Sequence, residues 1–453
     1  MFSEGIKALH PNHIVIGSFL CLILLGMVFL SLPVASSGER ISPIDALFTS
    51  ASAVCVTGLT VLDTGSDFSR FGQVVTIILI QLGGLGIATF STFFIFVLGG
   101  RLSLRGRGML ETTLTQFPVK NMKELLVKIL ALTFAFEAAG AVFLYFFLSR
   151  SAASSSVGFS ALYHSVSAFC NAGFSLYSTS LEAFRENVGV NAVVIALVLL
   201  GGIGFVVIVE LSELLFSRHG RRNRLSLHSK VVLSVTAALL LVGTVAFLVL
   251  EANNSLAGLS PGKKLLVSFF QAVTPRTAGF NTVTICSCTN ATLFFLIVLM
   301  FVGASPGSCG GGIKTTSFGV LLGLAVAKLK GSDDVNYFYR RVPDEIVSRA
   351  VAIVFFSMLV IVVMLMILSV TEPGLQGGRP GEGFLSLLFE IVSAFGTVGL
   401  STGVTSSLSV SGKLLLTILM LVGRLGPLTV AIALAAREVR PRFRYAEERL
   451  MIG

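Results

Sequence analysis

Four glycine-bearing stretches of this chain have the residue types and spacing to coordinate a cation. They read AVCVTGLT, AFCNAGFS, TPRTAGFN and FGTVGLST, and their shared glycines are Gly58, Gly173, Gly279 and Gly399. The two residues before each glycine are uncharged, so they offer backbone carbonyl oxygens; they are Val56, Thr57, Asn171, Ala172, Thr277, Ala278, Thr397 and Val398. Rings of carbonyls replace the hydration shell of an alkali cation, and glycine lets the backbone approach the ion closely. Because no ring of carboxylates accompanies them, the stretches predict a filter for a monovalent cation.

A fifth stretch, GASPGSCGGGIKTTS (303–317), interrupts an apolar segment that would otherwise cross a membrane. Glycine and proline weaken a helix by about 1 and about 3 kcal/mol each, so this stretch should be irregular. Irregular backbone at membrane depth must be buried in protein or line a water-filled cavity. We therefore predict a gate across the pore, formed by Gly303, Ser305, Pro306, Gly307, Ser308, Gly310, Gly311, Gly312 and Lys314.

Arg424 is predicted to belong to the same gate, because it lies at the same level of a later apolar segment. A lone arginine near the bilayer centre costs about 2.5–3.5 kcal/mol, so its side chain should face the cavity rather than lipid. There it would repel a cation and hold the loop through contacts such as those of Ser305 or Ser308. Lys314 could line the cavity below or extend toward the inner surface. A phosphate-binding loop is excluded here, since Ile313 precedes Lys314 where that motif requires glycine.

Composition places the chain among membrane proteins. It has 453 residues, of which 54% are hydrophobic and only 12% are charged, against about 25% charged in soluble domains. The net charge of +10 does not indicate a nucleic-acid partner, because its distribution fits membrane topology better. Segments 101–123, 217–230, 326–349 and 437–449 hold five Lys or Arg residues each. By the positive-inside rule these segments and both termini are expected in the cytoplasm, as in a multi-pass protein of the cytoplasmic membrane.

The apolar pattern repeats four times along the chain. Runs long enough to span lie at about 14–34, 71–98, 125–148, 190–216, 231–250, 291–327, 350–370 and 414–435. Shorter amphiphilic stretches at 43–53, 158–169, 263–273 and 383–395 each precede a glycine turn and predict re-entrant pore helices. The fold class is therefore an all-α polytopic membrane protein with four span–pore helix–span units around one pore. The units are 1–100, 101–220, 221–332 and 333–453, and we expect the second spans of units 1, 2 and 4 to continue through GGLG, GGIG and GRLG.

With AVCVTGL, CNAGF, TPRTAGF and TVGLS at its four turns, the chain resembles the Trk/Ktr/HKT superfamily of potassium transporters over nearly its whole length. Trk-type subunits carry an additional pair of spans before the first unit. This chain starts with its first unit, so the resemblance is to the Ktr type. That resemblance implies a homodimer on a cytosolic ring of nucleotide-binding regulatory subunits. It also implies an intramembrane gate loop and an arginine beside it, because Ktr-type subunits have both. Nucleotide is expected only on the ring, since this chain has no dinucleotide-binding fingerprint; the cation carried is K⁺, and no cofactor is expected in this chain.

The resulting function is the ion-translocating subunit of a potassium uptake system, and not an enzyme. A symporter coupled to Na⁺ or H⁺ is the first alternative, for which Glu137 inside the third span is a candidate proton site. A membrane receptor or scaffold without transport is the second, and it would have no use for four matching turns. Asp45, His164 and Glu390 lie on the short helices, and we expect their hydrogen bonds to brace the turns.

Overall fold

The computed structural model describes residues 11–86, 122–151, 156–216, 225–372 and 382–434. Three of the basic stretches expected on the cytoplasmic side, at 101–121, 217–224 and 435–453, lie outside these residues, as does the end of the second apolar run.

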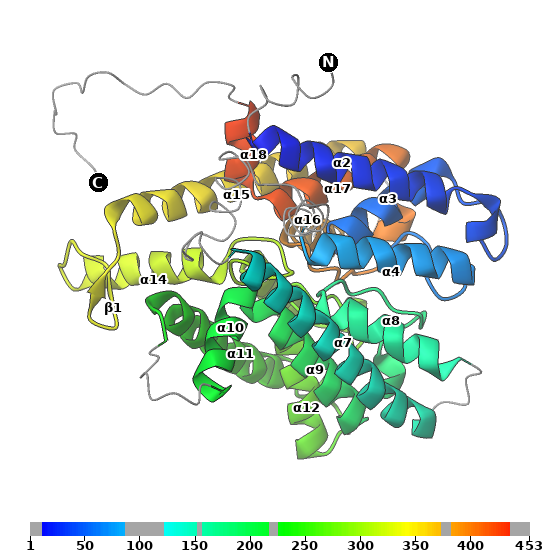
Figure 1. Cartoon of the computed structure of the whole chain (residues 1–453), viewed down its shortest axis with the longest axis horizontal. Helices are drawn as coiled ribbons and strands as arrows, with labels where there is room; N and C mark the ends of the chain where they lie inside the picture. The colour runs from blue at the N-terminus through cyan, green and yellow to red at the C-terminus, as the bar shows by residue number, and fades with distance from the viewer. Residues whose placement is uncertain (1–10, 87–121, 152–155, 217–224, 373–381, 435–453) are drawn as a thin grey trace.

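Four long helices alternate with four short ones along the chain (Figure 1). The long helices are α2 (Pro11–Leu30), α7 (Met122–Ser151), α11 (Leu227–Leu250) and α15 (Asp344–Thr371). The short helices are α3 (Pro43–Val54), α8 (Val157–Phe169), α12 (Pro261–Val273) and α16 (Glu382–Gly396). After the turns come α4 (Arg70–Gly84), α9 (Val188–Ile203), α10 (Phe205–Phe216), α13 (Asn290–Phe301), α14 (Thr315–Leu329), α17 (Val410–Leu425) and α18 (Pro427–Leu434). Single 3-10 turns lie in the connections: η1 (Pro33–Ala35), η3 (Glu182–Phe184), η4 (Ile285–Ser287) and η6 (Thr405–Ser407).

Polar side chains determine where the helices after the turns begin. The N-cap residues of α4, α9, α13 and α17 each accept a hydrogen bond from the backbone N–H three residues later; these residues are Ser69, Asn187, Thr289 and Ser409. Such a cap satisfies one of the free donors at a helix start and contributes about 1 kcal/mol. Two of the caps are also held by a carboxylate at the end of the preceding long helix. Glu251 accepts from the N–H of Thr289, and Glu372 accepts from the N–H of Ser409.

A glycine at positive φ lies just beyond the ends of α4, α9 and α17, and here one expectation is wrong. The second span of unit 2 does not continue through GGIG: α9 and α10 meet at a bend of 103°, where Gly204 has φ +101°. Likewise α17 ends before Gly426 (φ +88°), and α4 ends before Gly86 (φ +78°). These φ values lie in the region that glycine enters without steric cost, and helical backbone cannot pass through it.

The helices expose apolar side chains on the outside of the molecule. In the described residues, three helices are long and apolar enough to cross a membrane: Leu126–Ser149, Leu227–Leu250 and Asp344–Thr371. The bent pair of α9 and α10 passes the same test as one broken span. Exposed side chains on α7 and α15, such as Phe134, Phe143, Phe355 and Met366, have no place in water. The chain is therefore a multi-pass helical membrane protein.

The first and last parts of the chain pack side by side. Figure 1 shows α2, α3 and α4 together with α16 and α17, while α7 to α12 form the other half. An ion pair joins the two ends, because Lys413 Nζ lies 2.7 Å from Asp45 Oδ1. The chain thus closes on itself around the four turns.

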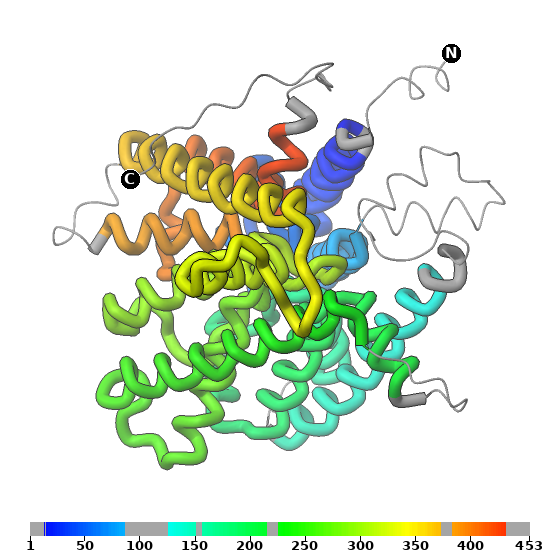
Figure 2. The backbone as a smooth tube through the Cα atoms, turned by 90° about the vertical axis from the view of Figure 1, so that its left-hand side faces the viewer, coloured from blue at the N-terminus to red at the C-terminus, as the bar shows by residue number. Residues whose placement is uncertain are grey.

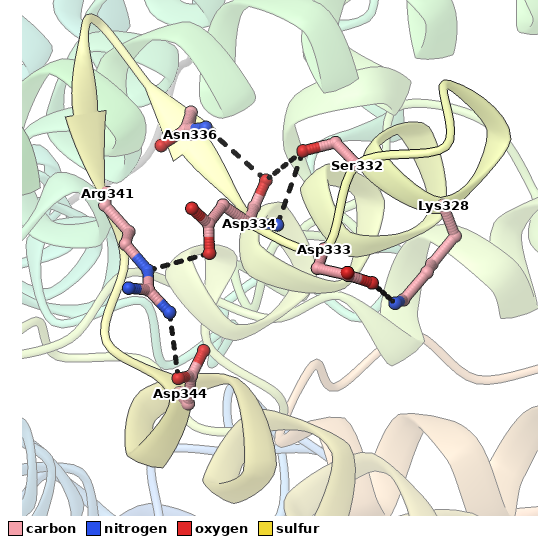
Figure 3. Close-up of polar contacts among 7 residues, drawn as sticks. All are labelled: Lys328, Ser332, Asp333, Asp334, Asn336, Arg341 and Asp344. Atoms are coloured by element: carbon pink, nitrogen blue, oxygen red, sulfur yellow. Dashed lines mark hydrogen bonds and ion pairs between the residues drawn. The ribbon is translucent and has the colours of Figure 1, made fainter.

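A two-stranded hairpin between α14 and α15 is the one described departure from an all-α fold. Strands β1 (Asn336–Tyr337) and β2 (Arg340–Arg341) pair antiparallel, and the hairpin faces the viewer in Figure 2. Its base is held by ion pairs of Arg341 with Asp334 (2.9 Å) and Asp344 (3.0 Å), drawn in Figure 3. Residues 338 and 339 form its two-residue turn, with φ of +48° and +61°.

Candidate functional site: the ring of glycine turns and the loop beneath it

The four glycine turns adopt one backbone conformation. In each turn, φ is positive both at the glycine and two residues before it, and not at the residue between them. The glycine values are +89°, +70°, +76° and +90° for Gly58, Gly173, Gly279 and Gly399; the others are +56°, +58°, +67° and +51° for Val56, Asn171, Thr277 and Thr397. Alternating handedness turns successive peptide groups to one side of the chain, so their carbonyl oxygens can face one cation. A side chain at positive φ costs about 1–2 kcal/mol, so four such residues mark a site whose shape matters.

The turns touch one another in a closed ring. A Cβ built on each glycine would meet the carbonyl oxygen before the glycine of the next turn. The distances are 2.4 Å (Gly58 to Ala172), 2.9 Å (Gly173 to Ala278), 2.5 Å (Gly279 to Val398) and 2.1 Å (Gly399 to Thr57). The order is therefore turn 1, 2, 3, 4 and back to 1, which brings all twelve predicted filter residues together. No side chain larger than hydrogen fits at the four glycines without moving a neighbouring carbonyl.

Hydroxyl groups at the ends of the short helices hold the turns in place. The N–H groups of Gly58 and Gly399 donate to Ser52 Oγ (3.0 Å) and Ser393 Oγ (3.1 Å). In turn 2, Ser167 Oγ donates instead to the Phe174 carbonyl (2.7 Å). These bonds come from the helices themselves, so the turns are seated on the four short helices.

The expected braces are present for two of three residues. His164 and Glu390 are buried and hydrogen-bond the segments that follow turns 2 and 4. Asp45 does not reach a turn: it accepts from Ser42 Oγ at the start of α3 and pairs with Lys413 of α17. Its place in the first turn of α3 explains this, since the carboxylate satisfies the helix start.

A cavity of about 640 Å³ opens above the ring, with the four glycines in its lining. Most of its other lining residues carry hydroxyl groups, among them Thr60, Ser175 and Ser401. Asp63 and Glu182 supply carboxylates, and no Lys or Arg of the described residues lines it. A hydrated cation can therefore reach the ring through polar surroundings of favourable charge.

On the opposite side of the ring, residues 303–314 form an irregular segment between α13 and α14. Its middle lies directly against turns 3 and 4. The Gly311 N–H donates to Thr397 Oγ1 (3.0 Å), and a Cβ on Gly310 would lie 2.1 Å from Thr277 Oγ1. Two of its glycines, Gly307 and Gly312, have φ of +67° and +66°. The segment is therefore not helical, and it crosses the molecule beneath the ring.

Backbone hydrogen bonds tie this loop to the bend between α9 and α10. Ser305 N–H donates to the Gly202 carbonyl (3.1 Å), and Cys309 N–H donates to the Gly201 carbonyl (3.2 Å). In the reverse direction, the N–H of Phe205 donates to the Gly307 carbonyl (2.9 Å). The glycines of GGIG thus leave their carbonyls open to the loop.

Arg424 contacts the loop, although through different atoms from those expected. Its guanidinium donates to the carbonyls of Cys309 and of Gly83 in α4, not to Ser305 or Ser308. Ser308 Oγ instead donates to the Ser305 carbonyl (2.6 Å), and Ser305 Oγ accepts from the hydroxyl of Thr315 at the start of α14 (3.0 Å).

Lys314 folds back onto the loop as well, with its Nζ donating to the Gly310 carbonyl (2.7 Å). Two cationic side chains therefore satisfy loop carbonyls at this level, while the Pro306 carbonyl oxygen would lie 2.6 Å from a Cβ built on Gly204 at the bend.

Sequence reasoning missed the surroundings of Glu137. Its carboxylate accepts from Gln81 Nε2 (3.2 Å) and contacts Cys170 Sγ (3.8 Å), both uncharged partners. Gly83 and Gly84, which follow Gln81, pack against Val54 and Cys170, and Gln81 thereby comes to lie beside Glu137. Among the described residues, no three His, Cys, Asp or Glu side chains form a metal site.

Comparison with known proteins decides the family. A family model described as TrkH, cation transport protein, matches residues 6–441. The chain belongs to the TrkH family. The resemblance expected from the glycine turns is thereby confirmed, and the family consists of transporters, not enzymes.

Individual relatives match over nearly their whole length. The Ktr system potassium uptake protein B of Bacillus subtilis is 37% identical over 445 residues, covering 98% of this chain and 96% of the relative. The potassium/sodium uptake protein NtpJ of Enterococcus hirae is 38% identical over 452 residues, covering 99% and 98%. The crystal structure of the potassium transporter TrkH from Vibrio parahaemolyticus aligns with a TM-score of 0.70 at 22% identity, covering 92% of this chain and 85% of that one. This last likeness concerns the TrkH fold alone.

Proposed function

We propose that this TrkH-family chain is the ion-translocating subunit of a potassium uptake system. The observation that carries the proposal is the closed ring of four turns with alternating positive φ, which presents backbone carbonyls where an unhydrated cation can bind. The names of the relatives, a potassium uptake protein and a potassium/sodium uptake protein, support K⁺ as the cation. The filter comprises the twelve turn residues, and the short helices act as pore helices in four pseudo-repeated units.

The loop of residues 303–314 is the gate in this proposal. It lies against Thr277 and Thr397, so it stands in the path of an ion leaving the ring. Arg424 holds it closed by joining Cys309 to Gly83, and its positive charge opposes a cation at the same level. Opening requires the release of these carbonyl contacts.

The membrane potential supplies enough free energy for uptake through such a pore. A monovalent cation entering along 100 mV gains about 2.3 kcal/mol, which supports about fifty-fold accumulation. No coupled ion is required. Coupling to Na⁺ remains the second candidate, because one relative is named a potassium/sodium uptake protein.

The partners follow from the same proposal. The chain forms a homodimer in the cytoplasmic membrane with both termini in the cytoplasm, on a cytosolic ring of nucleotide-binding subunits. The hairpin of Figure 3 is a docking element for that ring, since Tyr339 at its tip is fully exposed. Phe338 and Tyr339 are held at positive φ, a conformation that costs free energy. A docking role at the tip of the hairpin would account for that cost.

Growth of a potassium-uptake-deficient bacterium at low external K⁺ tests the function. Expression of this chain with its ring should restore growth, and uptake in vesicles should follow the membrane potential without added Na⁺. Failure of growth despite folded protein in the membrane contradicts the proposal. Uptake that requires Na⁺ favours the symporter, and normal folding without any cation flux favours a receptor or scaffold.

A further inference from the structure

Two buried polar residues occupy the same position in opposite quarters of the ring. His164 on α8 and Glu390 on α16 each lie nine residues before the glycine of their turn. Both side chains are buried, with 2% and 0% of their surface exposed. Turns 2 and 4 are not neighbours in the ring order 1, 2, 3, 4, so these residues stand behind turns that face each other across the axis.

Glu390 accepts hydrogen bonds from the segment after turn 4. Its Oε1 receives the hydroxyl of Ser401 (2.6 Å) and the N–H of Thr402 (2.8 Å), two and three residues beyond Gly399. Its Oε2 receives the hydroxyl of Thr405 (2.6 Å). The segment that follows turn 4 is therefore hydrogen-bonded to α16, the pore helix of the same unit.

His164 makes the equivalent contacts in turn 2. Its Nδ1 lies 2.7 Å from the Ser160 carbonyl, which can only accept, so Nδ1 carries the proton and Nε2 is the acceptor. Nε2 then receives the hydroxyl of Ser175 (3.0 Å) and the N–H of Leu176 (3.4 Å), again two and three residues beyond the glycine. An imidazole and a carboxylate thus play one role, with the ring stacked on Tyr177 at a centroid distance of 4.9 Å.

The other two quarters lack an acceptor at this position, although in unit 3 the neighbouring Gln271 Nε2 donates to the hydroxyl of Thr282 (3.4 Å). The matching residue in unit 1 is Thr49, whose buried hydroxyl has no hydrogen-bond partner among the described residues. In unit 3 it is the apolar Phe270. The acceptor is therefore a property of turns 2 and 4 and not of the fold in general.

We propose that His164 and Glu390 are a pair of positioning residues that set the separation of turns 2 and 4, and thereby the preference of the ring for potassium over the smaller sodium ion. The inference rests on the proposed function. Each acceptor holds the outer end of its turn away from the axis. Without it the two carbonyl sets can move inward, and a contracted ring suits a smaller cation.

The test compares acceptor-keeping and acceptor-removing variants of the full-length protein in proteoliposomes. Glu390→Gln and His164→Gln keep an acceptor oxygen, whereas Glu390→Leu and His164→Phe remove it. Thr49→Val is the matched control at the equivalent position of unit 1. The readout is the ratio of K⁺ to Na⁺ uptake, together with size-exclusion profiles that report folding.

The ratio should fall by about tenfold or more in the apolar variants and stay within about threefold of the parental ratio in the Gln variants and Thr49→Val. An unchanged ratio in folded Glu390→Leu and His164→Phe overturns the proposal. Equal losses in the Gln and apolar variants overturn it too, because charge or volume would then be responsible. If the apolar variants do not fold, the double variant Ser401→Ala/Thr405→Val removes the two closest hydroxyl donors to Glu390, and an unchanged ratio there also overturns the proposal. A parental protein that carries no potassium contradicts the proposed function, whereas a selective parent with unaltered variants contradicts only this inference.

Discussion

Replacing Arg424 by alanine should raise the maximal velocity of potassium uptake. The guanidinium makes two hydrogen bonds to carbonyls, one on the loop and one on α4. Hydrogen bonds to charged groups contribute about 1.5–3 kcal/mol each, so their loss removes about 3 kcal/mol from the seated loop at the lower estimate. That shifts the equilibrium between seated and released loop by about 150-fold. The velocity should rise by less than this factor if the loop of the parental protein is already released part of the time, because the released fraction cannot exceed one.

Arg424→Lys separates the bridge from the charge. A lysine keeps the positive charge at this level, but its ammonium lacks the rigid fork that reaches two carbonyls at once. If the bridge holds the gate, Arg424→Lys should also be faster than the parent; if charge alone closes the pore, it should match the parent. The second gate variant removes Ser305–Gly311, the loop segment beneath turns 3 and 4.

The assay is the initial rate of K⁺ uptake at saturating K⁺ in cells with equal amounts of folded protein. Selectivity over Na⁺ should be retained in Arg424→Ala and in the deletion, because no residue of the four turns is changed. Velocities at or below the parental value in both variants would refute the gate.

Three further predictions follow from contacts described above. Gly58→Ser places a Cβ 2.4 Å from the Ala172 carbonyl, so the K⁺ to Na⁺ uptake ratio should fall by about tenfold, and an unchanged ratio in folded protein contradicts the filter. Burial alone would raise the pKa of Glu251, but hydrogen bonds from Thr292, Thr289 and Ser255 outweigh it and lower that pKa. A carboxyl whose pKa is lowered in the folded state stabilises the fold at pH values above its ordinary pKa, and this stabilisation is lost as the pH falls through the lowered pKa. The melting temperature of Glu251→Gln should therefore lie below the parental one at about pH 7, and the difference should be smaller at about pH 3.5. An equal difference at both pH values contradicts the assignment. Purified chain alone should show no ATP response, and Tyr339→Ala should weaken binding of the nucleotide-binding ring in a pull-down; ATP-dependent flux without the ring, or full binding by the variant, counts against the docking proposal.

Local features of the sequence predicted most of the fold. The short helices at 43–54 and 261–273 and the irregular loop at 303–314 follow from residue types within one or two turns of chain. The bend at Gly204 could not be read from GGIG, because a glycine costs a helix only about 1 kcal/mol and often serves close packing. The bend depends on a tertiary contact, the hydrogen bond from the Phe205 N–H to the Gly307 carbonyl of the loop.

The partners of Arg424 were also beyond the sequence, since backbone carbonyls of Cys309 and Gly83 carry no residue-type signal. The equivalent positions of His164 and Glu390 could have been predicted from the sequence. Both precede their glycine by nine residues, and a comparison of the four units position by position would have aligned them.

The attachment of the loop to the bend at Gly204 has a mechanical consequence. α10 begins at that bend and is 12 residues long, so it is a stiff arm of about 18 Å whose near end is tied to the loop by the Phe205 N–H. A pull or a twist applied at the far end of α10 is transmitted along the helix to the loop backbone. In the proposed gate, Arg424 and α10 hold the loop at different carbonyls, those of Cys309 and Gly307, so movement of α10 would change the loop independently of the arginine contact.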